Sequence, residues 1–165
     1  MVTSVLFVCM GNICRSPTAE GVFQDLVSRE GLTDRIQIAS AGTHGWHVGN
    51  PPDPRSVEAA ARRGIDLSGQ RSQQFRAADH DRHDYVLAMD RENLQFLRQL
   101  HNDAARARLS LFLEFAPHIR ETDVPDPYYG AGDGFEIVLD MIEAASAGLL
   151  ADIRAAGNMA DGKQE

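Results

Sequence analysis

Short apolar runs rich in β-branched residues alternate along the chain with longer segments of helical periodicity. The runs lie at residues 4–9, 36–41, 85–88 and 109–113, and a helical pattern follows each of them. Parallel strands need a crossover connection, which is usually a helix, so this alternation is typical of βαβ units. The sequence therefore predicts an α/β fold built on four parallel strands.

Capping signals predict where the helices begin and end. Residues 16–17 and 53–54 each pair a polar N-cap with a proline in the first turn, and Asp90 is expected to cap a third helix. Gly31 and Gly64 are expected to end the first two helices, because glycine readily adopts the left-handed backbone found there.

The length of 165 residues predicts a single domain. A turn-rich segment over 121–134 precedes a last helix with an apolar face from Phe135 to Ile153. We expect the domain to cover residues 1–157 and a flexible tail to cover residues 158–165.

Charge and cysteine content narrow the function classes. The net charge of −8 and the absence of a basic cluster argue against nucleic acid or an anionic membrane surface as a partner. The apolar runs are too short to span a membrane. The two cysteines, Cys9 and Cys14, are too few for a disulfide framework, which favours a reducing compartment such as the cytoplasm.

The loop after the first strand carries the pattern C-x5-R followed by serine, from Cys9 to Ser16. It joins the end of a strand to the start of a helix, where backbone amides and the helix dipole converge and bind anions. Arg15 can hold two phosphoryl oxygens with its planar fork, and this setting favours an ionised, nucleophilic Cys9. A buried structural cysteine beside a surface arginine explains this arrangement less well.

The other loop residues suit the same chemistry. Gly11 allows the backbone to approach a ligand closely. Asn12 tolerates left-handed backbone and can hold the loop in its curled conformation through its side chain. The Ser16 hydroxyl can donate a hydrogen bond to a thiolate. The residues expected to surround the bound phosphate are Met10, Gly11, Asn12, Ile13, Cys14 and Ser16.

Two motifs carry a resemblance to a known family. Residues 5–20, VLFVCMGNICRSPTAE, resemble the phosphate-binding loop of the low-molecular-weight protein tyrosine phosphatases, and residues 126–130, DPYYG, resemble their general-acid loop. Segments 40–43, 49–55 and 88–94 are also similar. The resemblance implies one three-layer domain with a four-stranded parallel sheet of order 2-1-3-4 flanked by helices. It also implies a bacterial-type, cysteine-dependent hydrolase without metal or cofactor.

The resemblance assigns the general acid to Asp126. From the residues alone, D-P-x-x-G is better explained as a type I turn, and the resemblance reverses that preference. Asp90 and Asp133 are competing carboxylates, although each also fits a helix N-cap. A phosphatase of this kind needs an acid for the leaving oxygen and a base for water, and Asp126 is expected to serve as both.

Aromatic residues predict the substrate. Tyr128 and Tyr129 are expected to form one wall of the cleft and Trp46 the opposite wall, although Trp46 equally fits a partly buried core position. By resemblance, Ile13 follows the tyrosine-directed pattern, whereas arginine-directed members carry threonine there. We therefore expect phosphotyrosine proteins as substrates, a bacterial tyrosine kinase among them, and inorganic phosphate as product and inhibitor.

Three other functions fit parts of the pattern. A phosphoarginine phosphatase and an arsenate-reductase-like thiol enzyme share a similar loop, but the latter relays a disulfide through further cysteines, and none follows Cys14. A non-enzymatic phosphate-binding module needs neither Cys9 nor Asp126. Cys14 itself is interpreted either as packing or as a resolving thiol that forms a disulfide with an oxidised Cys9.

Residues 70–73 depart from the family pattern. Many members have a histidine here which, with a serine matching Ser40, supports the loop asparagine. Ser40 is therefore expected to support Asn12, and Gln70 either replaces the histidine or leaves its bond unmade. His80 and His83 are flanked by carboxylates, but they lack a third defined ligand, so a solvated loop is expected rather than a metal site.

Overall fold

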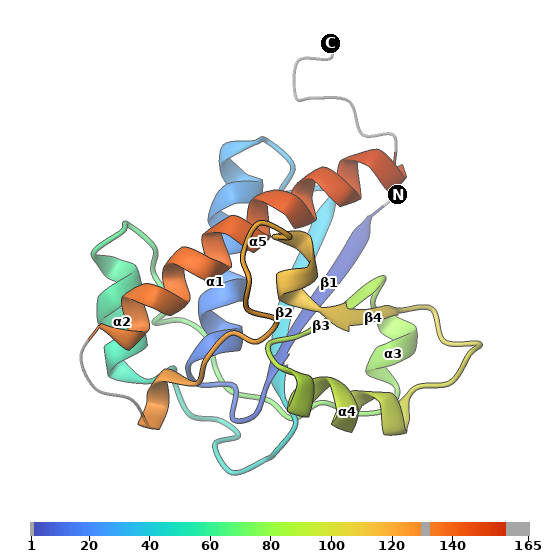
Figure 1. The fold of residues 1–165 in the computed structure, drawn as a ribbon, viewed down its shortest axis with the longest axis horizontal. Helices are drawn as coiled ribbons and strands as arrows, with labels where there is room; N and C mark the ends of the chain where they lie inside the picture. The colour runs from blue at the N-terminus through green and yellow to red at the C-terminus, as the bar shows by residue number, and fades with distance from the viewer. Residues whose placement is uncertain (1, 130–132, 158–165) are drawn as a thin grey trace.

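The computed structural model describes residues 2–129 and 133–157 and consists of a parallel sheet between two layers of helices (Figure 1). The sheet has the order β2-β1-β3-β4, as predicted. Its strands are β1 (Thr3–Cys9), β2 (Ile36–Gly42), β3 (Tyr85–Ala88) and β4 (Arg108–Leu111). The tail expected over residues 158–165 lies outside the described residues.

The helices lie on both faces of the sheet. One face is covered by α1 (Arg15–Arg29) and α5 (Gly134–Gly157), which contact each other, with α2 (Pro54–Ala61) packed beside them. The other face is covered by α3 (Asp79–Arg82) and α4 (Arg91–Leu100). Two short 3-10 helices are η1 (Phe112–Phe115) and η2 (Pro127–Tyr129).

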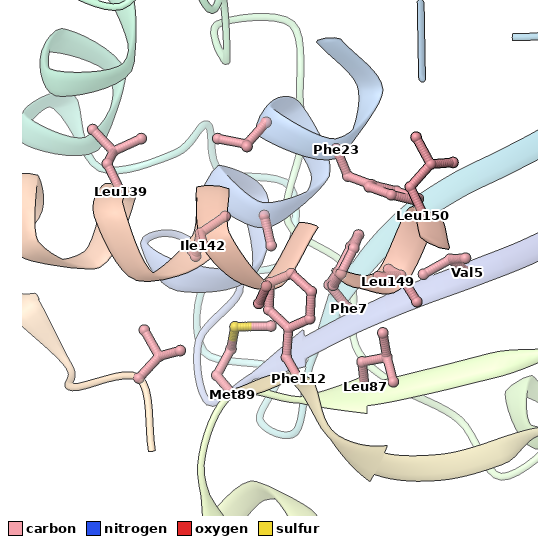
Figure 2. Close-up of a cluster of buried hydrophobic side chains, with 14 of the residues drawn as sticks. Val5, Phe7, Phe23, Leu87, Met89, Phe112, Leu139, Ile142, Leu149 and Leu150 are labelled. Atoms are coloured by element: carbon pink, nitrogen blue, oxygen red, sulfur yellow. The ribbon is translucent and has the colours of Figure 1, made fainter. Parts of the chain in front are cut away.

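Alternate side chains of β1 enter two separate cores. Val5 and Phe7 belong to the core beneath α1 and α5, while Leu6 and Val8 belong to the core beneath α4. Figure 2 shows the larger core, in which the Phe7 ring lies 4.9 Å from the Phe112 ring, centroid to centroid. Because β1 is buried on both faces, its carboxyl end is held firmly where Cys9 begins the loop to α1.

Two predicted element boundaries are wrong. Helix α1 begins at Arg15 with Cys14 as its N-cap, because the Ser16 hydroxyl contacts the Cys9 sulfur instead of capping the helix. Strand β4 ends at Leu111, since the Glu114 carboxylate accepts a hydrogen bond from the Leu111 amide and closes a turn there.

The expectation of a solvated loop around His80 is also wrong. This segment forms α3, and His80 is 1% exposed, with its Nε2 atom 3.0 Å from the Leu97 carbonyl oxygen. Its ring packs edge-on against Phe75 and His101. Within the part of the chain that the structure describes, no three His, Cys, Asp or Glu side chains form a metal-binding group.

Burial of His80 predicts acid lability. Burial and the nearby His101 lower the pKa of His80, outweighing the Leu97 hydrogen bond and two nearby aspartates. The unfolded chain then binds an extra proton below about pH 6.5, so stability should be full above that pH and should fall as the solution is acidified. We expect urea midpoints at pH 7.5 and pH 5.5 to differ less in His80→Leu than in the wild type.

The exposed His118 provides the control for this measurement, because its side chain lies in solvent and not in a core. His118→Leu should keep the wild-type pH dependence. Equal pH dependence in the wild type and His80→Leu would show that His80 does not contribute.

Among residues 2–129 and 133–157, no helix combines the length and the apolar character needed to cross a membrane.

Candidate active site

The loop between β1 and α1 curls around the sulfur of Cys9. Asn12 has a φ of 57°, in the left-handed region, and its backbone amide donates to the Cys9 sulfur at 3.3 Å. The Ser16 hydroxyl lies 3.0 Å from the same sulfur. Two potential donors therefore meet one sulfur at the N-terminus of α1, which is the arrangement that stabilises a thiolate.

Asn12 also anchors the loop to its surroundings. Its Nδ2 atom donates to the Oγ atoms of Ser16 at 2.8 Å and Ser40 at 2.9 Å. Its Oδ1 atom accepts from the Gln73 backbone amide at 2.9 Å, so both polar atoms of this buried amide are paired. Because Ser16 accepts from Asn12, the hydroxyl hydrogen of Ser16 can point to the Cys9 sulfur at 3.0 Å or to the Ala41 carbonyl oxygen at 3.4 Å, and the sulfur is the nearer of the two.

Gln70 does not take the place of the family histidine. Its Nε2 atom donates to the Pro17 carbonyl oxygen at 2.9 Å, and the Gln73 backbone meets Asn12 instead. The Ser40 hydroxyl donates to Glu20 at 2.7 Å, which extends the chain of hydrogen bonds. Burial raises the pKa of Glu20, and the bond from Ser40 opposes that shift. Gln73 and Glu20 were not among the sequence candidates.

The Arg15 side chain is 3% exposed and is held from two sides. Its Nη1 atom donates to Asp90 at 2.6 Å and to the Val124 carbonyl oxygen at 3.0 Å. Burial lowers the pKa of Arg15, but Cys9 and Asp90 raise it by more than burial lowers it. The pKa of Arg15 therefore lies above its ordinary value. Asp90, considered above as a competing acid, therefore caps α4 through the Asn93 amide and orients Arg15.

Asp126 lies across the pocket on the segment that leads into η2. Its Oδ2 atom is 3.5 Å from the Arg15 Nη2 atom, and its Oδ1 atom accepts from the Tyr128 amide at 3.0 Å. Asp133 lies at the start of α5 and does not line this pocket. The structure therefore brings Cys9, Arg15 and Asp126 together, although Asp126 is separated from the other two by more than half the chain.

A single pocket collects most of the predicted residues. Its walls are formed by Cys9, Met10, Gly11, Ile13, Cys14, Arg15, Trp46, His47, Asp126 and Tyr128. Asn12 and Ser16 are buried and do not line this pocket, but both contact the Cys9 sulfur. His47 was missed, because a histidine in an irregular loop carries no signal of its own. The side chain of Tyr129 lies outside the described part of the chain.

Aromatic side chains form the rim of the pocket. Trp46 is 68% exposed and stacks on His44 at a centroid distance of 4.3 Å, so its alternative as a core residue is wrong. Tyr128 is 40% exposed and also lines the pocket. The pocket thus has an apolar aromatic mouth and a polar floor made of a sulfur, a guanidinium and a carboxylate.

Comparison with known proteins identifies the family. Residues 4–159 match the low molecular weight phosphotyrosine protein phosphatase family. The chain belongs to this family. It is 42% identical over 151 residues to the low molecular weight protein-tyrosine-phosphatase YfkJ of Bacillus subtilis, an alignment that covers 92% of this chain and 96% of YfkJ.

Solved structures confirm the predicted fold class for this member of the low-molecular-weight phosphatases. The protein tyrosine phosphatase of Entamoeba histolytica superposes with a TM-score of 0.89 at 34% identity, covering 94% of this chain and 99% of that one. A Drosophila arginine phosphatase has the same fold, with a TM-score of 0.85 at 28% identity and coverage of 91% and 97%. This fold therefore occurs in phosphatases named for two different phosphorylated residues.

Proposed function

We propose that this phosphatase hydrolyses phosphotyrosine in proteins, and small aryl phosphates, through a phosphocysteine intermediate. The observation that supports this best is the pocket in which the Cys9 sulfur faces Arg15 and Asp126 beneath an aromatic rim. A nucleophile, a cation for the phosphoryl oxygens and a proton donor are the groups that phosphoryl transfer to a thiol requires.

In the first step, the Cys9 thiolate attacks phosphorus in line with the leaving oxygen. The S–P bond forms while the P–O bond to tyrosine breaks, and the Asp126 carboxyl gives its proton to the departing phenolate oxygen. Arg15 and the loop amides hold the three other phosphoryl oxygens throughout. Since Asp90 and the Val124 carbonyl fix the Arg15 fork before substrate arrives, little reorganisation is needed.

In the second step, the Asp126 carboxylate takes a proton from water. That water attacks phosphorus, the S–P bond breaks, and its electron pair returns to Cys9 as a thiolate, stabilised by the Ser16 hydroxyl 3.0 Å away. Inorganic phosphate remains in the cradle that held the phosphoryl group. It is therefore expected to inhibit the enzyme by competing with substrate.

The pocket walls favour phosphotyrosine over phosphoarginine. The exposed rings of Trp46 and Tyr128 provide flat apolar surfaces for a phenyl ring. Ile13 adds an aliphatic wall. Phosphoarginine remains the second candidate substrate, because the structurally similar Drosophila protein is named an arginine phosphatase.

Peptides that differ only in the phosphorylated residue test this assignment. We expect kcat/KM for a phosphotyrosine peptide to exceed that for the phosphoserine or phosphoarginine peptide by at least about tenfold, which is about 1.4 kcal/mol of transition-state stabilisation. Cys9→Ser serves as the control for contaminating phosphatases. A preference for the phosphoarginine peptide would contradict the proposed substrate.

The cellular setting follows from the chemistry of the nucleophile. Both cysteines are free and buried in the structure, and Cys9 must remain reduced to act. This requirement supports action in a reducing compartment such as the cytoplasm of a bacterium. Tyrosine-phosphorylated proteins there, including tyrosine kinases, are the proposed substrates.

Cys14 is proposed as a resolving thiol. When peroxide converts Cys9 to a sulfenic acid, the Cys14 sulfur attacks the Cys9 sulfur, an S–S bond forms, and the hydroxyl leaves as water with the Cys14 proton. Burial and the nearby Asp53 raise the pKa of Cys14 to about 12. Since the thiolate is the attacking species, we expect rescue to be slow at neutral pH and faster as the pH rises.

Peroxide should therefore inactivate the wild type, and a dithiol should restore it. Cys14→Ser should keep substantial activity but lose much of that recovery, while phosphate should protect both proteins. Intact mass measures the disulfide as a loss of two hydrogens. Equal recovery of the two proteins, without that mass loss, would leave Cys14 with a packing role only.

A further inference from the structure

The start of α2 lies between the phosphate loop and the acid loop. The Asp53 backbone amide donates to the Ile13 carbonyl oxygen at 2.8 Å, which attaches this helix end to the loop that carries Cys9. Asp53 is the N-cap of α2 and is 8% exposed. Its two carboxylate oxygens accept from Arg55 Nε at 3.1 Å and Nη2 at 2.9 Å. The pair is bidentate, so the direction of the guanidinium is fixed.

The far side of the Arg55 guanidinium contacts the segment that follows Asp126. Its Nη2 atom donates to the Tyr128 carbonyl oxygen at 3.4 Å. Its central carbon lies 5.5 Å from the centroid of the Tyr128 ring and 4.9 Å from that of Phe135, near the start of α5. One guanidinium thus meets the residues on both sides of the 130–132 segment.

Tyr128 connects these contacts to the general acid. The Tyr128 amide donates to Asp126 Oδ1 at 3.0 Å, while the Tyr128 carbonyl accepts from Arg55. A displacement of the Tyr128 backbone therefore moves the Asp126 carboxyl as well. On the other side, Asp53 connects Arg55 to Ile13, so a continuous series of contacts joins the nucleophile loop to the acid.

We propose that Arg55 is a positioning residue for the general acid, which it keeps at the correct distance from Cys9 by joining the two loops. The proposal rests on the proposed function of Asp126. Arg55 itself is not expected to touch substrate, because it does not line the pocket. Its side chain is 49% exposed, and an ion pair so exposed contributes little to global stability. Its loss should therefore affect the protonation step more than folding.

Leaving-group dependence separates this role from a merely structural one. Phenol is a poor leaving group and needs the proton of Asp126, whereas p-nitrophenolate leaves readily without it. For Arg55→Ala we expect kcat/KM to fall about tenfold with phenyl phosphate and less than about threefold with p-nitrophenyl phosphate. Arg55→Lys keeps the charge but not the fork and should recover only part of the loss.

Arg62→Ala is the matched control. Arg62 follows the same helix and pairs with Glu58 and with Glu136 of α5, so it also connects α2 to α5, but without touching Tyr128. Arg62→Ala should leave kcat/KM unchanged for both substrates. Urea midpoints of all variants report folding, and Arg55→Lys serves as the test should Arg55→Ala not fold. Equal losses of kcat/KM with both substrates, in whichever Arg55 variant folds, would overturn the proposal.

A double-mutant cycle with Asp126→Ala tests whether Arg55 acts through the acid. If it does, Arg55→Ala should change kcat/KM for phenyl phosphate by less than about twofold once Asp126 is gone. Independent effects that multiply would overturn the role of Arg55 alone. If Asp126→Ala lowers kcat/KM equally for phenyl phosphate and p-nitrophenyl phosphate, Asp126 is not the general acid. The proposed role of Arg55 is then wrong as well. The two failures are therefore distinguishable.

Discussion

Replacing Cys9 with serine should reduce the turnover of p-nitrophenyl phosphate by at least about a thousandfold. A serine hydroxyl needs a general base, and the groups hydrogen-bonded to the Cys9 sulfur are the Asn12 amide and the Ser16 hydroxyl, neither of which is basic. The variant hydroxyl therefore stays protonated at neutral pH. The measurement is kcat under saturating substrate.

Phosphate binding provides the control for that variant. The loop amides and Arg15 are unchanged in Cys9→Ser, so phosphate should still raise its melting temperature by mass action. Retained binding with lost turnover assigns the defect to the nucleophile. Turnover above about a thousandth of the wild-type value would contradict the role of Cys9.

Arg15→Lys should lower kcat/KM by about a hundredfold or more, through both weaker binding and a slower chemical step. The guanidinium is buried and already donates to Asp90 and the Val124 carbonyl while it faces the pocket. A lysine ammonium is a single point charge and cannot serve these partners and two phosphoryl oxygens together. Kinetics with p-nitrophenyl phosphate measure both effects.

Arg91→Lys is the matched control, because Arg91 follows Asp90 in the chain but its side chain is 74% exposed and pairs with Asp123. That change should leave kcat/KM unaltered. An unchanged kcat/KM in Arg15→Lys would remove Arg15 from the catalytic machinery. A loss confined to KM would limit Arg15 to binding of the ground state.

Local signals made the phosphate loop predictable from the sequence. A buried strand, a curled loop with Asn12 and a helix start lie within one short segment, so their relative placement follows from the chain itself. Glu20 could also have been found, because it lies one helical turn beyond Ser16 and so faces the same side of α1. To predict its contact with Ser40, only the position of the neighbouring strand β2 is needed.

Long-range contacts could not be predicted in this way. Asp90 has a complete local explanation as the cap of α4, and nothing in its surroundings indicates that its second oxygen holds Arg15. Asp126 lies in a sequence that fits a turn as well as an acid loop, and the resemblance alone singled it out. The Gln73 contact with Asn12 uses a backbone amide, which any residue type offers.

The errors have a common physical cause. Ser16 and His80 each had a plausible local interpretation, as a helix cap and as a solvated side chain. In the structure the Ser16 hydroxyl turns to the Cys9 sulfur, and a single helical turn directs His80 inward toward Leu97. Tertiary partners outweighed the local preference in both cases.

Isolation of the phosphoenzyme tests the central claim most directly. Asp126→Ala should still react with p-nitrophenyl phosphate, whose leaving group needs no proton, but should hydrolyse the intermediate slowly because no base activates water. We predict a burst of one p-nitrophenolate per enzyme and, after quenching in denaturant, one phosphoryl group on the peptide that contains Cys9. A phosphoryl group on any other residue, or a burst without a phosphoenzyme, would contradict the mechanism.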